Sequence, residues 1–203
     1  MLLTLLFFFT FVSHHGSATW INDSVLDIDG VALRVGARYS ILPVIRGSGG
    51  GVTLGAGRNN SCFTGVVQDR FEVSGGTPVV FSPVNKLQSV VRISTDMNIK
   101  FSPSYRRDAG QCSLSRTWKL GEFDEETKQY FVTIGGEEGR VGAGGVANWF
   151  KIERNGNDYN LLFCPTVCDV CRVMCRQVGI YIDKGVRRLA LSDVPFRVMF
   201  KKM

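Results

Sequence analysis

The chain has 203 residues, and 24 lysines and arginines against 18 aspartates and glutamates give it a formal net charge of +6. Cationic and acidic residues are interspersed rather than gathered into blocks, which excludes the basic tracts of nucleic-acid-binding proteins. Beyond the first residues no run is long and apolar enough to span a bilayer. Neither nucleic acid nor a membrane is therefore expected as a partner of the folded protein.

The first predicted element is a secretory signal over Met1–Ala18. Leu2–Val12 is almost entirely apolar but too short to cross a membrane, and the small residues Gly16–Ala18 suit a signal peptidase. No Lys or Arg precedes the apolar run, so a buried N-terminal strand or helix is the alternative. Cleavage near Ala18 leaves one secreted domain, 19–203, of about 185 residues.

Residue chemistry argues against an enzyme. Both histidines, His14 and His15, lie inside the predicted signal. The mature chain therefore has no histidine for a Ser-His-Asp or Cys-His mechanism or for a zinc site. The acidic pairs Glu125-Glu126 and Glu137-Glu138 are expected on solvated turns, where they form no acid–base dyad. No cofactor and no metal are expected.

Short runs rich in Val, Ile, Phe and Tyr recur between turn signals, and several alternate apolar with polar residues. No run has helical periodicity, so the pattern predicts an all-β domain of many short strands. Periodicity alone does not choose between a sandwich and a barrel. The predicted strands are 39–45, 65–68, 90–93, 98–101, 129–134, 148–152, 159–163, 178–182 and 197–200.

Two glycine-rich stretches, 46–57 and 141–147, are predicted to be loops. The first lacks the Gly-Lys-Ser/Thr ending of a phosphate-binding loop and precedes no predicted helix, so a flexible connection is favoured. Acceptor sequences for N-glycosylation occur at Asn22 and Asn59 and suit a secreted chain. Their occupancy is left open, and Asn59 is only three residues from Cys62.

Four of the six cysteines lie between Cys164 and Cys175. If Asp169-Val170 is the tip of a hairpin, Cys168 faces Cys171 and Cys164 faces Cys175, at separations compatible with disulfides. Cys62–Cys112 is then the remaining, long-range pair. An oxidising compartment favours this interpretation over a four-cysteine zinc site or a redox-active pair.

Several separate motifs carry a family resemblance across the mature chain. Val25-Leu-Asp-Ile-Asp-Gly30 with Tyr39-Ser-Ile41 resembles the N-terminal signature of plant Kunitz inhibitors of the soybean trypsin inhibitor type. Gly179-Ile-Tyr-Ile-Asp183 resembles their C-terminal part. The cysteine cluster, 129–136 and 149–153 are most similar to the miraculin-like branch.

The resemblance implies a β-trefoil of twelve strands in three pseudo-repeats, a short barrel with a hairpin cap. It implies the same disulfides, Cys62–Cys112, Cys164–Cys175 and Cys168–Cys171. It also implies a secreted inhibitor of trypsin-like endopeptidases with a role in plant defence, acting outside the cell or in a vacuole. The alternative is a non-inhibitory binding or storage protein on the same scaffold.

By family position, the inhibitory loop corresponds to Pro83, Val84, Asn85, Lys86 and Leu87. Such a loop is held extended, as a substrate is, which lowers the entropy cost of binding. Counting from Ser82-Pro83 puts Asn85 at the cleavage position, and counting from Cys62 puts Lys86 there. A trypsin-like pocket favours Lys86, which could equally be a solvated loop lysine.

Two departures from the family pattern matter. An Asn that usually stiffens the loop by hydrogen bonding is replaced by Val35, which cannot do so. The segment directly after Glu153, Arg154-Asn-Gly-Asn157, contains no cysteine for an interchain bridge, so a monomer is expected.

Overall fold

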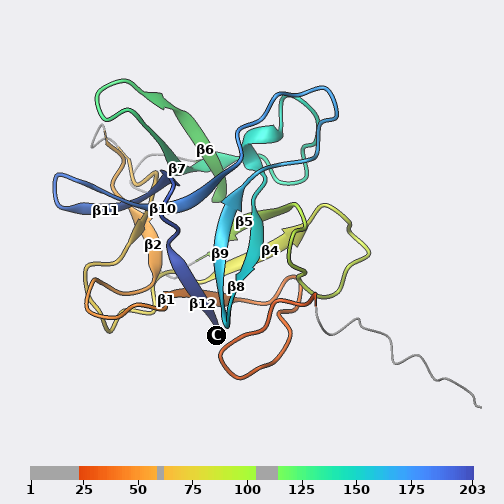
Figure 1. Ribbon diagram of the computed structural model, residues 1–203, viewed down its shortest axis with the longest axis horizontal. Coiled ribbons are helices and arrows are strands. Elements are labelled where there is room, and N and C mark those ends of the chain that lie inside the picture. Colours follow the sequence, from red (N-terminus) through yellow and green to blue (C-terminus); the bar gives the residue numbers. More distant parts are fainter. Residues whose placement is uncertain (1–22, 59–61, 104–113) are drawn as a thin grey trace, which may run out of the picture.

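The computed structural model describes residues 23–58, 62–103 and 114–203, and in these ranges the chain forms twelve strands and one short 3₁₀ helix (Figure 1). No helix in these ranges is long and apolar enough to cross a membrane. The elements are β1 (Tyr39–Pro43), β2 (Val52–Gly55), β3 (Gly65–Gln68), β4 (Val79–Pro83), β5 (Met97–Phe101), β6 (Thr117–Asp124), β7 (Gln129–Gly136), η2 (Val146–Asn148), β8 (Lys151–Asn155), β9 (Asp158–Phe163), β10 (Arg176–Asp183), β11 (Val186–Ser192) and β12 (Arg197–Lys202).

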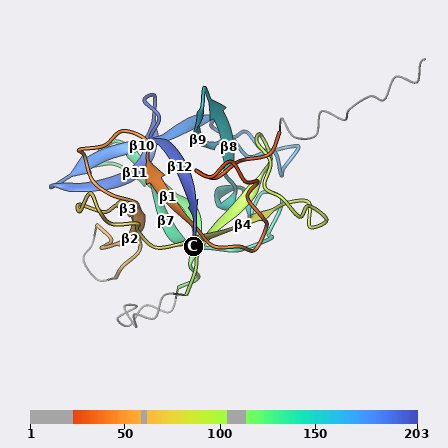
Figure 2. The ribbon, with the colours of Figure 1, turned by 90° about the horizontal axis from the view of Figure 1, so that it is seen from below.

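Six strands close into a barrel. Antiparallel pairing joins β12 to β1, β1 to β4, β4 to β5, β8 to β9 and β9 to β12. Seen from below, β1 and β12 run beside each other through the middle of the molecule (Figure 2). A bridge between Met97 and Phe150, with backbone hydrogen bonds of 2.9 Å in both directions, closes the ring between β5 and β8. Each barrel strand thus has a partner on both sides, which removes the unpaired edges of an open sheet.

One layer of the barrel interior is formed by one apolar side chain from each strand. These six residues form three directly opposed cross-strand pairs, and none is more than 1% exposed: Ile41 with Phe200, Phe81 with Ile99, and Ile152 with Leu161. The rings of Phe81 and Phe200 meet edge to face with centroids 5.6 Å apart. Opposed pairs of this kind are the unit of sheet stabilisation, so period-two patterning in the strands is what fixes the register.

The other six strands form three hairpins, β2–β3, β6–β7 and β10–β11, which cap the barrel. Each hairpin pairs with the other two at one backbone position: Arg188 with Val67, Ala190 with Phe131, and Gly65 with Thr133. Three four-stranded repeats, β1–β4, β5–β8 and β9–β12, thus share one threefold arrangement. The expected β-trefoil is confirmed.

Residues 23–35 lie against the outside of the barrel and cover the connection between β4 and β5. The segment turns at Asp27, whose carboxylate accepts hydrogen bonds from the N–H groups of Asp29 (3.0 Å) and Val31 (2.9 Å). Hydroxyl groups from the barrel hold it in place, since Tyr159 accepts from the Leu26 N–H and Tyr39 from the Arg34 N–H. This is the structural reason for the Leu-Asp-x-Asp-Gly pattern near the N-terminus.

Several strand predictions need correction. Val90–Ile93 is not a strand: its residues make only isolated bridges, Arg34 with Val90 and Ser24 with Arg92. The glycine-rich stretch 46–57, predicted to be a loop, contains β2, which pairs with β3 along its whole length. Residues 146–148, partly assigned to a strand, form η2 instead. The strands β4, β6 and β11 were not predicted.

Candidate functional site

The connection between β4 and β5 runs from Val84 to Asp96 and projects from the end of the barrel (Figure 1). Its base is closed by a 2.8 Å hydrogen bond from the Val84 N–H to the Asp96 carbonyl. Pro83 ends β4 and is buried, whereas Asn85 and Lys86 are exposed and Leu87 is 94% exposed. Of the five residues expected in the loop, Pro83 therefore lies buried in β4, and the other four, 84–87, form an exposed tip.

The tip is folded into a turn. The Asn85 side-chain oxygen accepts a hydrogen bond from the Leu87 N–H at 3.0 Å, and the Asn85 carbonyl accepts one from the Gln88 N–H at 3.2 Å. This is an Asx turn closed over Lys86 and Leu87, a conformation that asparagine favours. The extended, substrate-like form implied by the family resemblance is therefore not the one that this segment has.

The second half of the connection is attached to the N-terminal segment. The Val35 N–H donates to the Ser89 carbonyl at 3.0 Å, and the Val91 N–H donates to the Leu33 carbonyl at 2.8 Å. Val91 and Leu33 are fully buried. Val35 thus lies beside the loop, as its family position implies, but its apolar side chain packs against the core and offers the loop no hydrogen bond.

The end of β4, directly before the connection, is held by a carboxylate. Glu138, between β7 and η2, accepts a hydrogen bond from the Ser82 hydroxyl at 2.6 Å and from the Lys100 ammonium at 3.1 Å. The Ser82 hydrogen bond, together with Lys100 and the positive charge of Lys86, holds the pKa of Glu138 below its ordinary value. Glu137, the neighbouring residue, instead pairs with Arg140 at 2.8 Å.

The cysteine segment continues the β9–β10 pairing. Arg176 is paired with Phe163, and the same register places Cys164 opposite Cys175 and Cys168 opposite Cys171. The structure contains both nested disulfides, with Cα–Cα distances of 4.2 Å for the outer pair and 5.4 Å for the inner pair. The thiols that a zinc site would need are therefore consumed.

The Cys168–Cys171 segment is a tight turn with Asp169 and Val170 at its tip, since the Cys171 N–H bonds the Cys168 carbonyl. Cys62 is also disulfide-bonded. Its expected partner, Cys112, lies outside the described residues, and so do the signal segment 1–18 and both glycosylation acceptors, Asn22 and Asn59.

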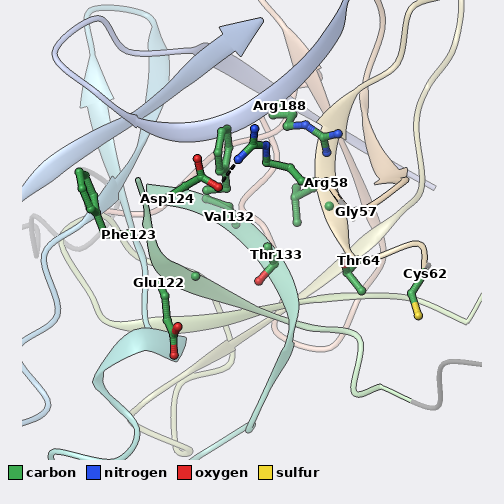
Figure 3. A pocket seen from close by; sticks show the side chains of 14 residues that line it. Gly57, Arg58, Cys62, Thr64, Glu122, Phe123, Asp124, Val132, Thr133 and Arg188 are labelled. Carbon is green, nitrogen blue, oxygen red and sulfur yellow. Dashed lines mark hydrogen bonds and ion pairs between the residues drawn. The ribbon is translucent and has the colours of Figure 1, made fainter. Parts of the chain in front are cut away.

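A cavity of about 500 Å³ opens at the cap, between the β2–β3 connection, the β6–β7 hairpin and β11 (Figure 3). Arg58 spans its upper wall, where it pairs with Asp124, with Glu126 at 2.9 Å and with Asp183 at 3.1 Å. Arg188 pairs with the same Asp183 at 2.8 Å. Arg58 and Arg188 thus link the β2–β3 connection, the β6–β7 hairpin and the β10–β11 hairpin.

These ion pairs change the acidity of the carboxylates. Burial alone would raise the pKa of Asp183, but the guanidinium groups of Arg188 and Arg58 hold that pKa below its ordinary value. Hydrogen bonds from Thr127 lower the pKa of Asp124, and Arg58 lowers it further. In Figure 3 the Glu122 side chain points away from the Arg58–Asp124 pair. The arrangement is that of a structural clamp.

Comparison with known proteins assigns the chain to a family. Residues 25–202 match the legume Kunitz family, described as trypsin and protease inhibitors. The chain belongs to the plant Kunitz family of protease inhibitors. The expectation of a protein that is not an enzyme is confirmed by this membership.

Two curated relatives are similar to the chain over most of its length. Kunitz trypsin inhibitor 5 from Arabidopsis thaliana is 49% identical over 193 residues, which cover 95% of this chain and 92% of the relative. Miraculin from Synsepalum dulcificum is 50% identical over 184 residues, which cover 88% of this chain and 82% of the relative. The chain is therefore about equally similar to a named inhibitor and to miraculin.

Solved Kunitz structures share the fold. A Kunitz-type cysteine protease inhibitor from potato is 35% identical with a TM-score of 0.75, covering 89% of this chain and 97% of that one. Soybean trypsin inhibitor, in its complex with porcine pancreatic trypsin, is 30% identical with a TM-score of 0.72 and covers 89% and 99%. Kunitz inhibitors of this fold thus bind serine proteases such as trypsin.

The hydrogen bond between Ser82 and Glu138, which supports the loop, was not predicted from the sequence. Glu138 was expected on a solvated turn, but it reaches Ser82, 56 residues away along the chain. No local pattern links the two positions, because they meet only when the β7–η2 connection folds over β4 and β5. The one available signal was Ser82 itself, a polar residue directly before the loop proline.

Proposed function

We propose that the protein inhibits endopeptidases, trypsin-like serine proteases first among them, through the exposed segment Pro83–Leu87. The observation that carries the proposal is the position of Lys86 and Leu87 at the tip of a connection whose two ends are fixed to the barrel. The Kunitz trypsin inhibitor at 49% identity supports the choice of target class. Lys86 is the side chain that would enter a pocket with a buried carboxylate.

The turn at Asn85 must open before a protease can bind this segment as a substrate. Opening breaks the two hydrogen bonds that Asn85 accepts from Leu87 and Gln88. At about 1 kcal/mol for each bond, the loss of both corresponds to roughly thirtyfold in affinity. We therefore expect inhibition of trypsin to be weaker than that of a Kunitz inhibitor whose loop is already extended.

A titration of trypsin with the purified, oxidised protein and two lysine variants tests the proposal. Lys86→Ala should abolish inhibition. Lys184→Ala, a change at an exposed lysine on the tip of the β10–β11 hairpin, should leave it unchanged. Equal inhibition by all three proteins would exclude Lys86 as the residue in the protease pocket. No inhibition by any of them would reject trypsin as the target.

An inhibitor of this kind would act outside the cell or in a vacuole. Its proposed role is plant defence. We propose that residues 1–18 are removed as a signal and that 19–203 act as a monomer. N-terminal sequencing of the protein purified from its source should begin near Thr19, and sedimentation should give the monomer mass. An N-terminus at Met1 would contradict secretion by this route.

The second candidate function is a non-inhibitory binding or storage protein. Two observations favour it: the closed turn at Asn85 and the apolar residue Val35 at the position where inhibitors carry an asparagine. The similarity to miraculin and to the 21 kDa seed protein of Theobroma cacao, 43% identical, agrees with it. Under this alternative, trypsin would either ignore the loop or cut it rapidly without being inhibited.

A further inference from the structure

The strand that leads into the loop, β4, is contacted from outside the barrel by a side chain of the connection between β7 and η2. Burial in β4 alternates, so that Phe81 and Pro83 point into the molecule and Ser82 points to the opposite face. Ser82 is therefore the last side chain before the loop that can be reached from outside the barrel. Its hydroxyl donates to Glu138 at 2.6 Å.

The position of Glu138 is itself fixed by the barrel. Asn98 in β5 is paired with Ser82 and is fully buried. Its side chain accepts a hydrogen bond from the Gly139 N–H at 2.7 Å and donates one to the Asn148 carbonyl at 2.8 Å. The segment that carries Glu138 is thus docked onto the strands that flank the loop, directly beside Ser82.

The charges around Glu138 connect it to the tip of the loop as well. Lys100 in β5 pairs with its second carboxylate oxygen at 3.1 Å. Lys86, inside the loop, is the other cation that acts on this carboxylate, and its attraction contributes to the lowered pKa of Glu138. On its own segment the charges are Glu137 and Arg140, which pair with each other.

We infer that Glu138 is a positioning residue for the inhibitory loop: its carboxylate ties Ser82, at the first arm of the loop, to Lys100 in β5, attracts Lys86 and so holds the turn at the tip closed. The inference rests on the function proposed above. The bond to the arm is a charge-assisted hydrogen bond, the stronger kind in proteins. It restrains the loop from the β4 side, whereas the family's asparagine acts from the N-terminal segment.

A pH dependence of the loop follows. Because the folded pKa of Glu138 is lowered, the carboxylate stabilises the braced loop above the ordinary glutamate value. That stabilisation is lost as the pH falls through the folded pKa, where Glu138 gains a proton and loses its attraction for Lys86 and Lys100. The turn at Asn85 should therefore loosen in acid while the barrel stays folded.

The test compares Glu138→Gln with Glu137→Gln, a matched change at the adjacent residue, and with Ser82→Ala, which removes the other partner. Amide exchange of Leu87 and Gln88 is measured by NMR near pH 7 and in acid, and the inhibition constant for trypsin is measured on the same proteins. Both Glu138→Gln and Ser82→Ala should speed exchange at these two amides by roughly threefold to tenfold. Because the turn must open before a protease binds, both should tighten inhibition by a similar factor. In the Glu138→Gln protein the protection of these amides should depend less on pH than in the wild-type protein. Glu138→Asp, which keeps a carboxylate, should retain part of the wild-type pH dependence.

The two proposals fail in different ways. Equal loop exchange in the Glu138→Gln and Glu137→Gln proteins would overturn the positioning role, whether or not trypsin is inhibited. Faster loop exchange at Glu138→Gln without inhibition by any variant would reject trypsin inhibition and leave the positioning role standing. The melting temperature of each variant is also measured, to detect general destabilisation. A positioning role predicts that Glu138→Gln and Ser82→Ala melt at nearly the same temperature as the wild-type protein.

Discussion

In the proposed mechanism, Asn85 and Val35 determine how readily the loop adopts the form that a protease binds. Asn85 closes the tip through its side chain, and Val35 occupies the place from which an amide could hold the loop open. Neither residue belongs to the opposed pairs inside the six barrel strands, although Val35 packs against the core. Inhibitory strength can thus vary at these positions while the scaffold stays intact.

Replacing Val35 by asparagine should tighten trypsin inhibition. The new amide would lie next to the Ser89 carbonyl and could bond the loop backbone, which would favour an open, ordered loop. One added hydrogen bond corresponds to roughly a tenfold lower inhibition constant. Val35→Ala, which removes the side chain without adding an amide, is the control. An inhibition constant unchanged by Val35→Asn would count against this account of the loop.

At the scale of elements, the sequence was informative at several short apolar runs that stand between turn signals. Tyr39–Pro43, Gly65–Gln68 and Asp158–Phe163 were located to within a few residues. The strand β2 was missed because glycines surround it, although its pairing with β3 needs only backbone groups. β6 was missed because Gly121 and charged residues interrupt its pattern and its pairing shifts register there.

Val90–Ile93 was predicted to be a strand but is not one. Its composition is that of a strand, but its partner is the irregular N-terminal segment rather than another strand. Burial of Val91 against Val25 and Leu33 explains the apolar residues without a sheet. A single sequence does not reveal such a partner, and for the same reason it did not reveal the contact between Ser82 and Glu138.

The disulfide hairpin between β9 and β10 gives an element-scale prediction. Replacing Cys164 and Cys175 together by alanine removes the outer bridge, which closes 11 residues, and should lower the free energy of unfolding by about 3 kcal/mol. Replacing Cys168 and Cys171, which close a loop of three, should lower it by only about 2 kcal/mol. Guanidinium unfolding measures both values. A larger loss for the inner pair would contradict the loop-closure account.

For the whole molecule, the Arg58 cluster joins the three cap hairpins and should make stability depend on pH. Asp183 has a lowered folded pKa, so its contribution is present above the ordinary aspartate value and is lost as the pH falls through the folded pKa. Asp183→Asn should therefore destabilise the protein near pH 7 by about 2–4 kcal/mol, because Arg188 is left buried without its carboxylate.

The difference between the wild-type protein and Asp183→Asn should shrink in acid, as the wild-type carboxylate takes up its proton. Unfolding in guanidinium at a series of pH values measures this. Asp193→Asn, at an exposed carboxylate paired with Arg176, is the control and should cost at most about 1 kcal/mol. A difference for Asp183→Asn that stays constant from neutral to acid pH would show that its ionisation does not stabilise the fold.

We propose that a protease binds the segment Pro83–Leu87 as a substrate and cleaves it very slowly. The most direct measurement is mass spectrometry of the protein incubated with catalytic amounts of trypsin, followed over time together with residual trypsin activity. The account predicts slow cleavage at one bond, Lys86–Leu87, with the two ends kept in one molecule by the barrel and with trypsin inhibited throughout. Rapid cleavage without inhibition, or an intact loop with fully active trypsin, would contradict it.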